Sequence, residues 1–197
     1  MRFIDIAPKL FPAETRDSIA WLAEDFRTLD AEEFFDRYPD LLIDYEDSAD
    51  FEEECRTGVI GLSTLIVWTM VDQGILLQLD WEGEEEEGVL AGFLEYRLEG
   101  MDDRVIRLDA EPLYEKFRED AAAECPQLQL GQHLPLLFRY LNAQLLPYGY
   151  RMLCFDANCD QYYIGVFPLN EAKHLLALKI DDIMILDVDD FDRNSTD

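Results

Sequence analysis

The sequence predicts a helix-rich α+β fold in which helices cover one small, mainly antiparallel sheet of about four strands. Apolar residues recur at helical spacing through much of the first 146 residues. Two runs rich in aromatic and β-branched residues, 150–155 and 162–167, flank a segment with turn-forming residues, as in a β-hairpin. With 197 residues, 49% of them hydrophobic, the chain is long enough to bury a core as a single domain, residues 1–197.

The N-terminal segment, residues 1–43, is predicted to be helical and to pack on the core. Its first helix spans residues 13–29, and Asp30 is placed to cap a short second helix, which Pro39 ends. The apolar side of the first helix is formed by Ile19, Trp21, Leu22, Phe26 and Leu29.

A long helical pattern follows the acidic run at residues 44–54. Apolar positions continue at helical spacing from Phe51 through Val71, and Gly74 is expected to close the helix. The longest uncharged stretch, residues 57–71, is shorter than the roughly 20 apolar residues of a membrane-spanning helix. A helix buried in the core is therefore favoured.

The middle of the chain is predicted to alternate between short strands and helices. The elements are a strand at 75–81, a helix introduced by 82–87 that ends near residue 100, a strand or connector at 105–108, and a helix that begins at 109–112 and ends by 126. In the last helix Leu113, Phe117 and Ala121 are expected to be buried.

The C-terminal part is predicted to be a helix followed by a ββαβ unit. The helix at 132–146 carries a core stripe of Leu134, Leu137, Phe138, Leu141 and Leu145. After the hairpin, Asn170 is expected to cap a helix that runs to about residue 178, and residues 183–188 form a further strand. The tail, 189–197, has few apolar anchors and is expected to be frayed.

The charge balance is the feature of the composition that bears most on function. The chain has 16 basic and 44 acidic residues, which gives a net charge of −28 at pH 7. Nucleic acids and anionic membranes are bound through Lys and Arg, so both are disfavoured as partners. Basic proteins, cationic ligands or metal ions would be attracted instead. The alternative is that the acidic surplus only keeps the protein soluble.

The start of the sequence and its cysteines are typical of a cytoplasmic protein. Met1 is followed by Arg2 and Asp5 without an apolar run, so no export signal is predicted. Four cysteines without CxxC spacing are interpreted as reduced thiols, namely Cys55, Cys125, Cys154 and Cys159.

No residue pattern indicates an enzyme, a metal site or a cofactor. Residues 156–160 and 187–194 gather oxygen ligands but lack the glycine and distal glutamate of a calcium loop, which favours solvated acidic turns. Cys154 or Cys159 with His174 is the one nucleophile and base pair that can be constructed, and a buried structural thiol is the favoured interpretation. We therefore expect a non-enzymatic protein without catalytic residues.

Two short stretches resemble members of an uncharacterised bacterial family of domains of unknown function. They are Leu79-Asp80-Trp81 and Tyr148-Gly149-Tyr150, the latter followed by Asp156, Asp160, Tyr162 and Tyr163. Acidic proteins that are similar to this one in general character often occur as immunity partners in bacterial toxin systems. The resemblance implies a binding role and brings no catalytic residue with it.

Charge and resemblance together predict a protein that binds a basic protein. Its most specific form is a bacterial immunity protein that neutralises a basic toxin by occluding the toxin's active cleft. The predicted contact residues are Asp44, Glu46, Asp47, Asp50, Glu84, Glu85, Glu86, Asp156, Asp160 and whichever of Tyr162 and Tyr163 faces outward. The alternative is a small-molecule or divalent-cation binding protein, or an enzyme, with a pocket between the sheet and the 132–146 helix.

Overall fold

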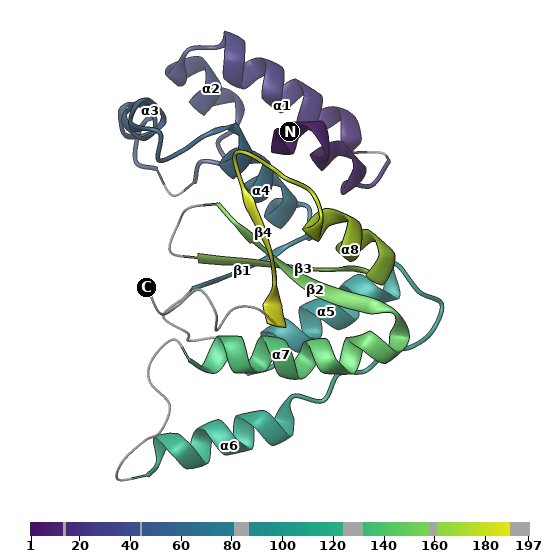
Figure 1. The fold of residues 1–197 in the computed structure, drawn as a ribbon. Helices are drawn as coiled ribbons and strands as arrows, with labels where there is room; N and C mark the ends of the chain where they lie inside the picture. The colour runs from purple at the N-terminus through teal and green to yellow at the C-terminus, as the bar shows by residue number, and fades with distance from the viewer. Residues whose placement is uncertain (14, 44, 81–86, 124–131, 158–160, 190–197) are drawn as a thin grey trace. The chain divides into compact units, whose positions relative to one another are not determined.

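The computed structural model describes residues 1–13, 15–43, 45–80, 87–123, 132–157 and 161–189. The chain divides into two compact units. The helical unit comprises residues 1–75 and 179–184, and the sheet unit comprises residues 76–178 and 185–197. Together their elements confirm the predicted helix-rich α+β class, with one small antiparallel sheet (Figure 1). Of the tail that was expected to fray, residues 190–197 lie outside the described residues.

The helical unit is built mainly from the predicted N-terminal helices and the long apolar pattern that follows them. Its elements are η1 (Phe3–Asp5), η2 (Ala7–Lys9), α1 (Arg16–Thr28), α2 (Ala31–Arg37), α3 (Ser48–Thr57) and α4 (Leu62–Asp72). The Asp30 side chain accepts a hydrogen bond from the Glu33 amide at 2.9 Å, which confirms its predicted role as the cap of α2. Both η1 and α1 pack against α4.

The predicted single helix from Phe51 to Val71 was wrong, because α3 and α4 are separate helices. Gly58 has a left-handed φ of 78° and donates its amide to the Cys55 and Glu54 carbonyls, which ends α3. Gly61 then adopts an extended conformation at the start of α4. Gly74, as expected, lies just beyond the end of α4 with a φ of 63°.

The predicted buried stripe of α1 was wrong at Trp21. Ile19, Leu22 and Ala23 are buried, whereas the Trp21 side chain is 67% exposed. Residues two apart in a helix are separated by about 200°, so Trp21 lies on nearly the opposite side of α1 from Ile19. One large aromatic residue of this helix therefore faces solvent.

Residues 179–184 join the helical unit through hydrogen bonds at its N-terminus. The carboxylate of Asp182 accepts from the Phe3 amide at 2.8 Å and from the Ser63 hydroxyl at 2.6 Å. The Asp181 carboxylate accepts from the ammonium group of Met1 at 2.8 Å. These contacts tie the segment that follows the last helix back to η1 and α4.

The sheet unit contains the predicted hairpin and the ββαβ arrangement. Its elements are β1 (Leu77–Asp80), α5 (Val89–Glu99), α6 (Glu111–Ala121), α7 (His133–Leu145), η3 (Leu146–Tyr148), β2 (Tyr150–Asp156), β3 (Gln161–Pro168), α8 (Leu169–Leu176) and β4 (Met184–Asp187). The strand order is β1-β3-β2-β4. In the antiparallel hairpin Cys154 lies opposite Ile164, and Leu77 of β1 pairs with Ile164 from the other side.

Both faces of this sheet are buried. Alternate residues of the hairpin, including Met152, Cys154 and Val166, belong to a core layer with α5 and α7. Residues on the opposite face, including Phe155 and Tyr163, are fully buried as well, and α8 packs on β2 and β3 from that side (Figure 1). This double burial explains why the two strands read as almost continuous apolar runs.

Three local predictions in the sheet unit need correction or refinement. Helix α8 begins after Pro168, and Asn170 is an exposed residue of its first turn rather than its cap. Helix α6 buries Tyr114 most deeply, and Ala121 is exposed. Residues 105–108 form a connector without regular structure, held by the Glu95 carboxylate, which accepts from the Leu108 amide at 2.7 Å.

Candidate functional site

The acidic residues of the helical unit are concentrated in one segment, residues 30–54. This segment holds twelve acidic residues and one basic residue, Arg37. Helices α2 and α3 pack on each other through the stacked rings of Phe34 and Phe51, whose centroids are 5.6 Å apart. Because the apolar sides of the two helices face inward, most of their carboxylates are exposed. The partly buried Glu54, which accepts from the Tyr45 hydroxyl, is the exception among the described residues of the two helices.

Three of the predicted contact residues lie together at the start of α3. Glu46, Asp47 and Asp50 are all exposed. Asp47 caps the helix by accepting from the amides of Ala49 and Asp50 at 2.9 and 3.1 Å, and Asp50 lies in the first turn, where the helix dipole favours a carboxylate. Local helix stability thus accounts for Asp47 and Asp50, and it does not account for Glu46.

The remaining predicted contact residues do not gather into an exposed patch within the part of the chain that the structure describes. Asp44, Glu84, Glu85, Glu86 and Asp160 lie outside the described residues. Asp156, at the end of β2, is partly buried.

The expectation that either Tyr162 or Tyr163 faces outward was wrong. Tyr163 is fully buried, and the partly buried Tyr162 packs edge-on against Phe138 of α7, with ring centroids 5.5 Å apart. The two tyrosines do lie on opposite faces of the hairpin, but helices cover both of these faces.

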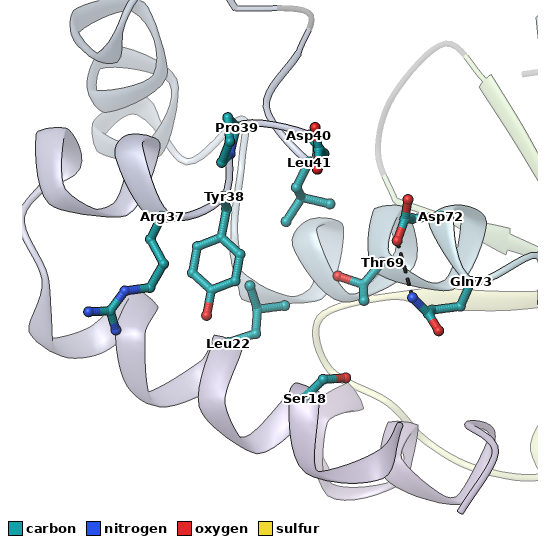
Figure 2. Close-up of a pocket in the computed structure, with 10 residues that line it drawn as sticks. All are labelled: Ser18, Leu22, Arg37, Tyr38, Pro39, Asp40, Leu41, Thr69, Asp72 and Gln73. Carbon is teal, nitrogen blue, oxygen red and sulfur yellow. Dashed lines mark hydrogen bonds between the residues drawn. The ribbon is translucent and has the colours of Figure 1, made fainter. Parts of the chain in front are cut away.

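A pocket lies within the helical unit, and the sequence did not predict it. Figure 2 shows this α1–α4 pocket, a cavity of about 250 Å³ between α1, the segment after α2 and the end of α4. It is lined by Ser18, Leu22, Arg37, Tyr38, Pro39, Asp40, Leu41, Thr69, Asp72 and Gln73. Its residues come from three separate elements, so no local sequence pattern could have indicated it.

A hydrogen-bonded group holds the α2 side of the α1–α4 pocket to α1. The Asp25 carboxylate accepts from the Tyr38 hydroxyl at 2.7 Å and from the Arg37 guanidinium at 2.8 Å. Both bonds lower the pKa of Asp25 below its usual range, and the bond from Tyr38 has the larger effect. Burial and the bond to Asp25 raise the pKa of Tyr38 to about 12, so its hydroxyl stays protonated.

The exposed Trp21 is close to this pocket on the surface of α1. It lies three residues after Ser18, which lines the pocket, and four before Asp25, and these spacings place side chains on neighbouring parts of a helix surface. Tryptophan is enriched at protein interfaces, so the exposed Trp21 is a candidate contact residue.

Comparison with known proteins identifies the family. Residues 6–182 match the model of a domain of unknown function, DUF6630. The chain belongs to this family. The match extends far beyond the strand and hairpin that suggested an uncharacterised family, and it includes most of both units. No curated protein and no solved structure matches the chain.

In this DUF6630 domain, the nucleophile and base pair considered from the sequence does not form between Cys154 and His174. Cys154 is buried in the layer with α7, whereas His174 is an exposed residue of α8, and Cys159 lies outside the described residues. Among the described residues no group of His, Cys, Asp and Glu side chains could hold a metal ion. The described part of the chain also contains no helix that is long and apolar enough to cross a membrane.

The layer between the DUF6630 sheet and α7 is filled by side chains. All five predicted stripe residues of α7 are buried there against the hairpin, and they are Leu134, Leu137, Phe138, Leu141 and Leu145. A ligand bound in this layer would have to displace core residues.

We expect the stabilising effect of Asp25 to depend on pH. Its folded pKa lies below the ordinary value of 3.8, so the stabilisation is complete above about pH 4 and is lost as the pH falls through the folded pKa. Asp25→Asn should lower the thermal midpoint at neutral pH, and its difference from the wild type should shrink in acid. Thermal denaturation followed by circular dichroism measures this, and a difference that stays constant with pH would contradict it.

We expect the Cys55 thiol to react more slowly than an ordinary cysteine. Burial and the neighbouring Glu54 carboxylate raise its pKa to about 11. The thiolate fraction at pH 8 is then about 100-fold below that of an ordinary cysteine, partly offset by higher nucleophilicity, so alkylation should be about tenfold slower. Iodoacetamide labelling with peptide mapping measures the rate. The same thiol in denaturant is the control, and equal rates in both states would contradict the expectation.

Proposed function

We propose that this protein is a non-enzymatic binding protein that holds a basic protein partner through residues 30–54. Its most specific form is a cytoplasmic bacterial immunity protein that neutralises a basic toxin. The observation that carries the proposal is the concentration of twelve acidic residues against one basic residue in this segment, whose two helices, α2 and α3, carry most of their carboxylates on exposed residues.

The carboxylates of this segment exceed what the fold itself requires. Asp30 and Asp47 cap helices, and Glu53 pairs with Arg56 at 2.6 Å. Asp36 and Glu46 are exposed and have no such local role in the described part of the segment. Surplus carboxylates that repel one another destabilise a compact state, and a complementary positive partner would relieve this repulsion.

The expected mechanism is electrostatic attraction followed by occlusion. A negative face accelerates the approach of a positive partner and aligns the two surfaces. Apolar groups then exclude water at the contact, and exposed candidates are Ile43 within the segment, 77% exposed, and Trp21 of α1, 67% exposed. An enzyme held in this way is blocked because its cleft is covered, without any reaction on the part of the binding protein.

The test begins with the protein that co-purifies at low ionic strength from the cells that produce this chain naturally. We expect that protein to be basic, and its association rate to fall at least tenfold between about 20 and about 150 mM salt, because the Debye length shortens accordingly. An acidic partner, or an association rate that does not depend on salt, would refute the proposal.

Matched charge variants locate the binding face. Asp36→Asn, Glu46→Gln and Glu52→Gln together remove three exposed carboxylates from the 30–54 segment, and we expect the association rate at low salt to fall about fivefold. The control variant, Asp103→Asn with Glu115→Gln and Glu119→Gln, removes the same charge from exposed positions of the sheet unit. Equal effects of the two variants would show that net charge alone, rather than this face, attracts the partner.

A further inference from the structure

The size of the α1–α4 pocket suits one side chain. Its volume of about 250 Å³ is below the range of about 300–1,000 Å³ that is usual for pockets of drug-sized ligands and cofactors. Leu22, Tyr38 and Leu41 give it an apolar surface on which the hydrocarbon stem of a long side chain can pack (Figure 2).

The hydroxyls of the pocket have already used their hydrogens. The Ser18 hydroxyl donates to the carbonyl of Thr15, just before α1, at 2.5 Å, and the Thr69 hydroxyl donates to a carbonyl of its own helix at 2.8 Å. The Tyr38 hydroxyl donates to Asp25 at 2.7 Å. A hydroxyl has one hydrogen and two lone pairs, so these groups offer acceptors to a bound molecule. The pocket therefore favours a ligand that is rich in N–H donors.

The charges at the rim favour a cation. Asp40 and Asp72 are exposed carboxylates of the lining. The Asp72 carboxylate accepts a hydrogen bond from the side-chain amide of Gln73 at 3.2 Å. Arg37 also lines the pocket, but its charge is balanced by Asp25, and Figure 2 shows its guanidinium at the far end of the group from Asp72. Among the described residues of the lining, two carboxylates are thus left without a balancing cation.

We infer that the α1–α4 pocket receives an arginine side chain of the basic partner. The stem packs on Leu22 and Leu41, and the guanidinium donates to Asp40, Asp72 and the hydroxyl oxygens. Arginine fits better than lysine because its planar head carries five donors and stacks on aromatic rings such as that of Tyr38. The inference rests on the proposed function, since it names the group by which the partner is anchored.

The test uses N-acetyl-arginine amide as the probe in an NMR titration of the isotopically labelled full chain. We expect saturable shifts of the Leu22 and Leu41 methyl signals. The matching citrulline derivative has the same shape without the charge and should bind at least about tenfold more weakly, since hydrogen bonds to charged groups are the stronger ones. Equal affinity for both probes, or shifts confined to α3, would overturn the inference.

Two pairs of variants make the result specific. Ser18→Phe fills the pocket and should abolish the methyl shifts, whereas Ala20→Phe adds the same ring at an exposed position that does not line the pocket. Asp40→Asn with Asp72→Asn should weaken probe binding, and Asp103→Asn with Glu115→Gln should not. Circular dichroism confirms that each variant is folded. A response to the probe that survives in Ser18→Phe would place the binding elsewhere and overturn the inference.

The two proposals fail in different experiments. If the pocket does not bind the arginine probe, the further inference fails, but the proposed salt-dependent association of a partner with the 30–54 segment is not affected. Conversely, a partner that associates independently of salt refutes the proposed function even where the probe binds.

Discussion

Gly165→Val should lower the free energy of unfolding by about 3 kcal/mol, because the sheet has no room for a side chain at this position. A Cβ atom on Gly165 would lie 2.6 Å from Cδ2 of Leu76 and 2.8 Å from Cε2 of Phe167. Leu76 and Phe167 are themselves buried, so neither can move aside without disturbing its own neighbours. Denaturation with urea measures the effect.

The matched control is a glycine with free space around it. Gly92 lies in α5 and is exposed, and a Cβ atom added there would meet no atom of the described residues within 4 Å. Gly92→Ala should therefore stabilise the protein by up to about 1 kcal/mol through helix propensity. A Gly165→Val protein as stable as the wild type would show that the layer around Leu76 can adapt.

Asn142→Leu should also cost about 3 kcal/mol, because it removes a buried polar link between α7, β2 and the segment after β4. Asn142 is fully buried, its Oδ1 accepts from the Met152 amide at 3.0 Å, and its Nδ2 donates to Asp189 at 3.1 Å. Leucine has nearly the same size, so the loss comes from a buried N–H without a partner rather than from a cavity. Equilibrium unfolding in urea gives the value.

A second substitution separates hydrogen bonding from packing. Asn142→Asp keeps an acceptor for the Met152 amide and replaces the donor to Asp189 by a second carboxylate oxygen. Two carboxylates in contact raise the pKa of one of them, so the variant should be closer to the wild type in stability in acid than at neutral pH. A variant that shows the same loss of stability at both pH values would contradict the assigned bonds.

Much of the fold could be predicted because its signals are local. The α7 stripe is buried at all five predicted positions, and the hairpin forms with the expected strands. Asp30 caps α2 as its position indicates. Each of these features depends on residues that are close in sequence, where periodicity and turn chemistry act directly.

The errors have more than one cause. Apolar character placed Trp21 with Ile19 and Leu22, which are buried as expected, but Trp21 lies on nearly the opposite side of α1 and faces solvent. The alternation of side chains along the strand correctly placed Tyr162 and Tyr163 on opposite faces of the sheet. Helices cover both faces, however, so neither tyrosine is exposed. The break at Gly58 was missed because glycine is also tolerated within helices, and the positive φ with which Gly58 ends α3 is not visible in the sequence.

By itself the sequence determined the acidic character of this protein, its helices and its hairpin, since composition, period and turn residues need no tertiary contact to be read. The tertiary structure alone decided which carboxylates are left over once caps and ion pairs are formed. It also created the α1–α4 pocket, because Ser18, Tyr38 and Asp72 are far apart along the chain and meet only when α1, α2 and α4 pack together. A binding site of this kind is a property of packed surfaces, and no single segment carries it.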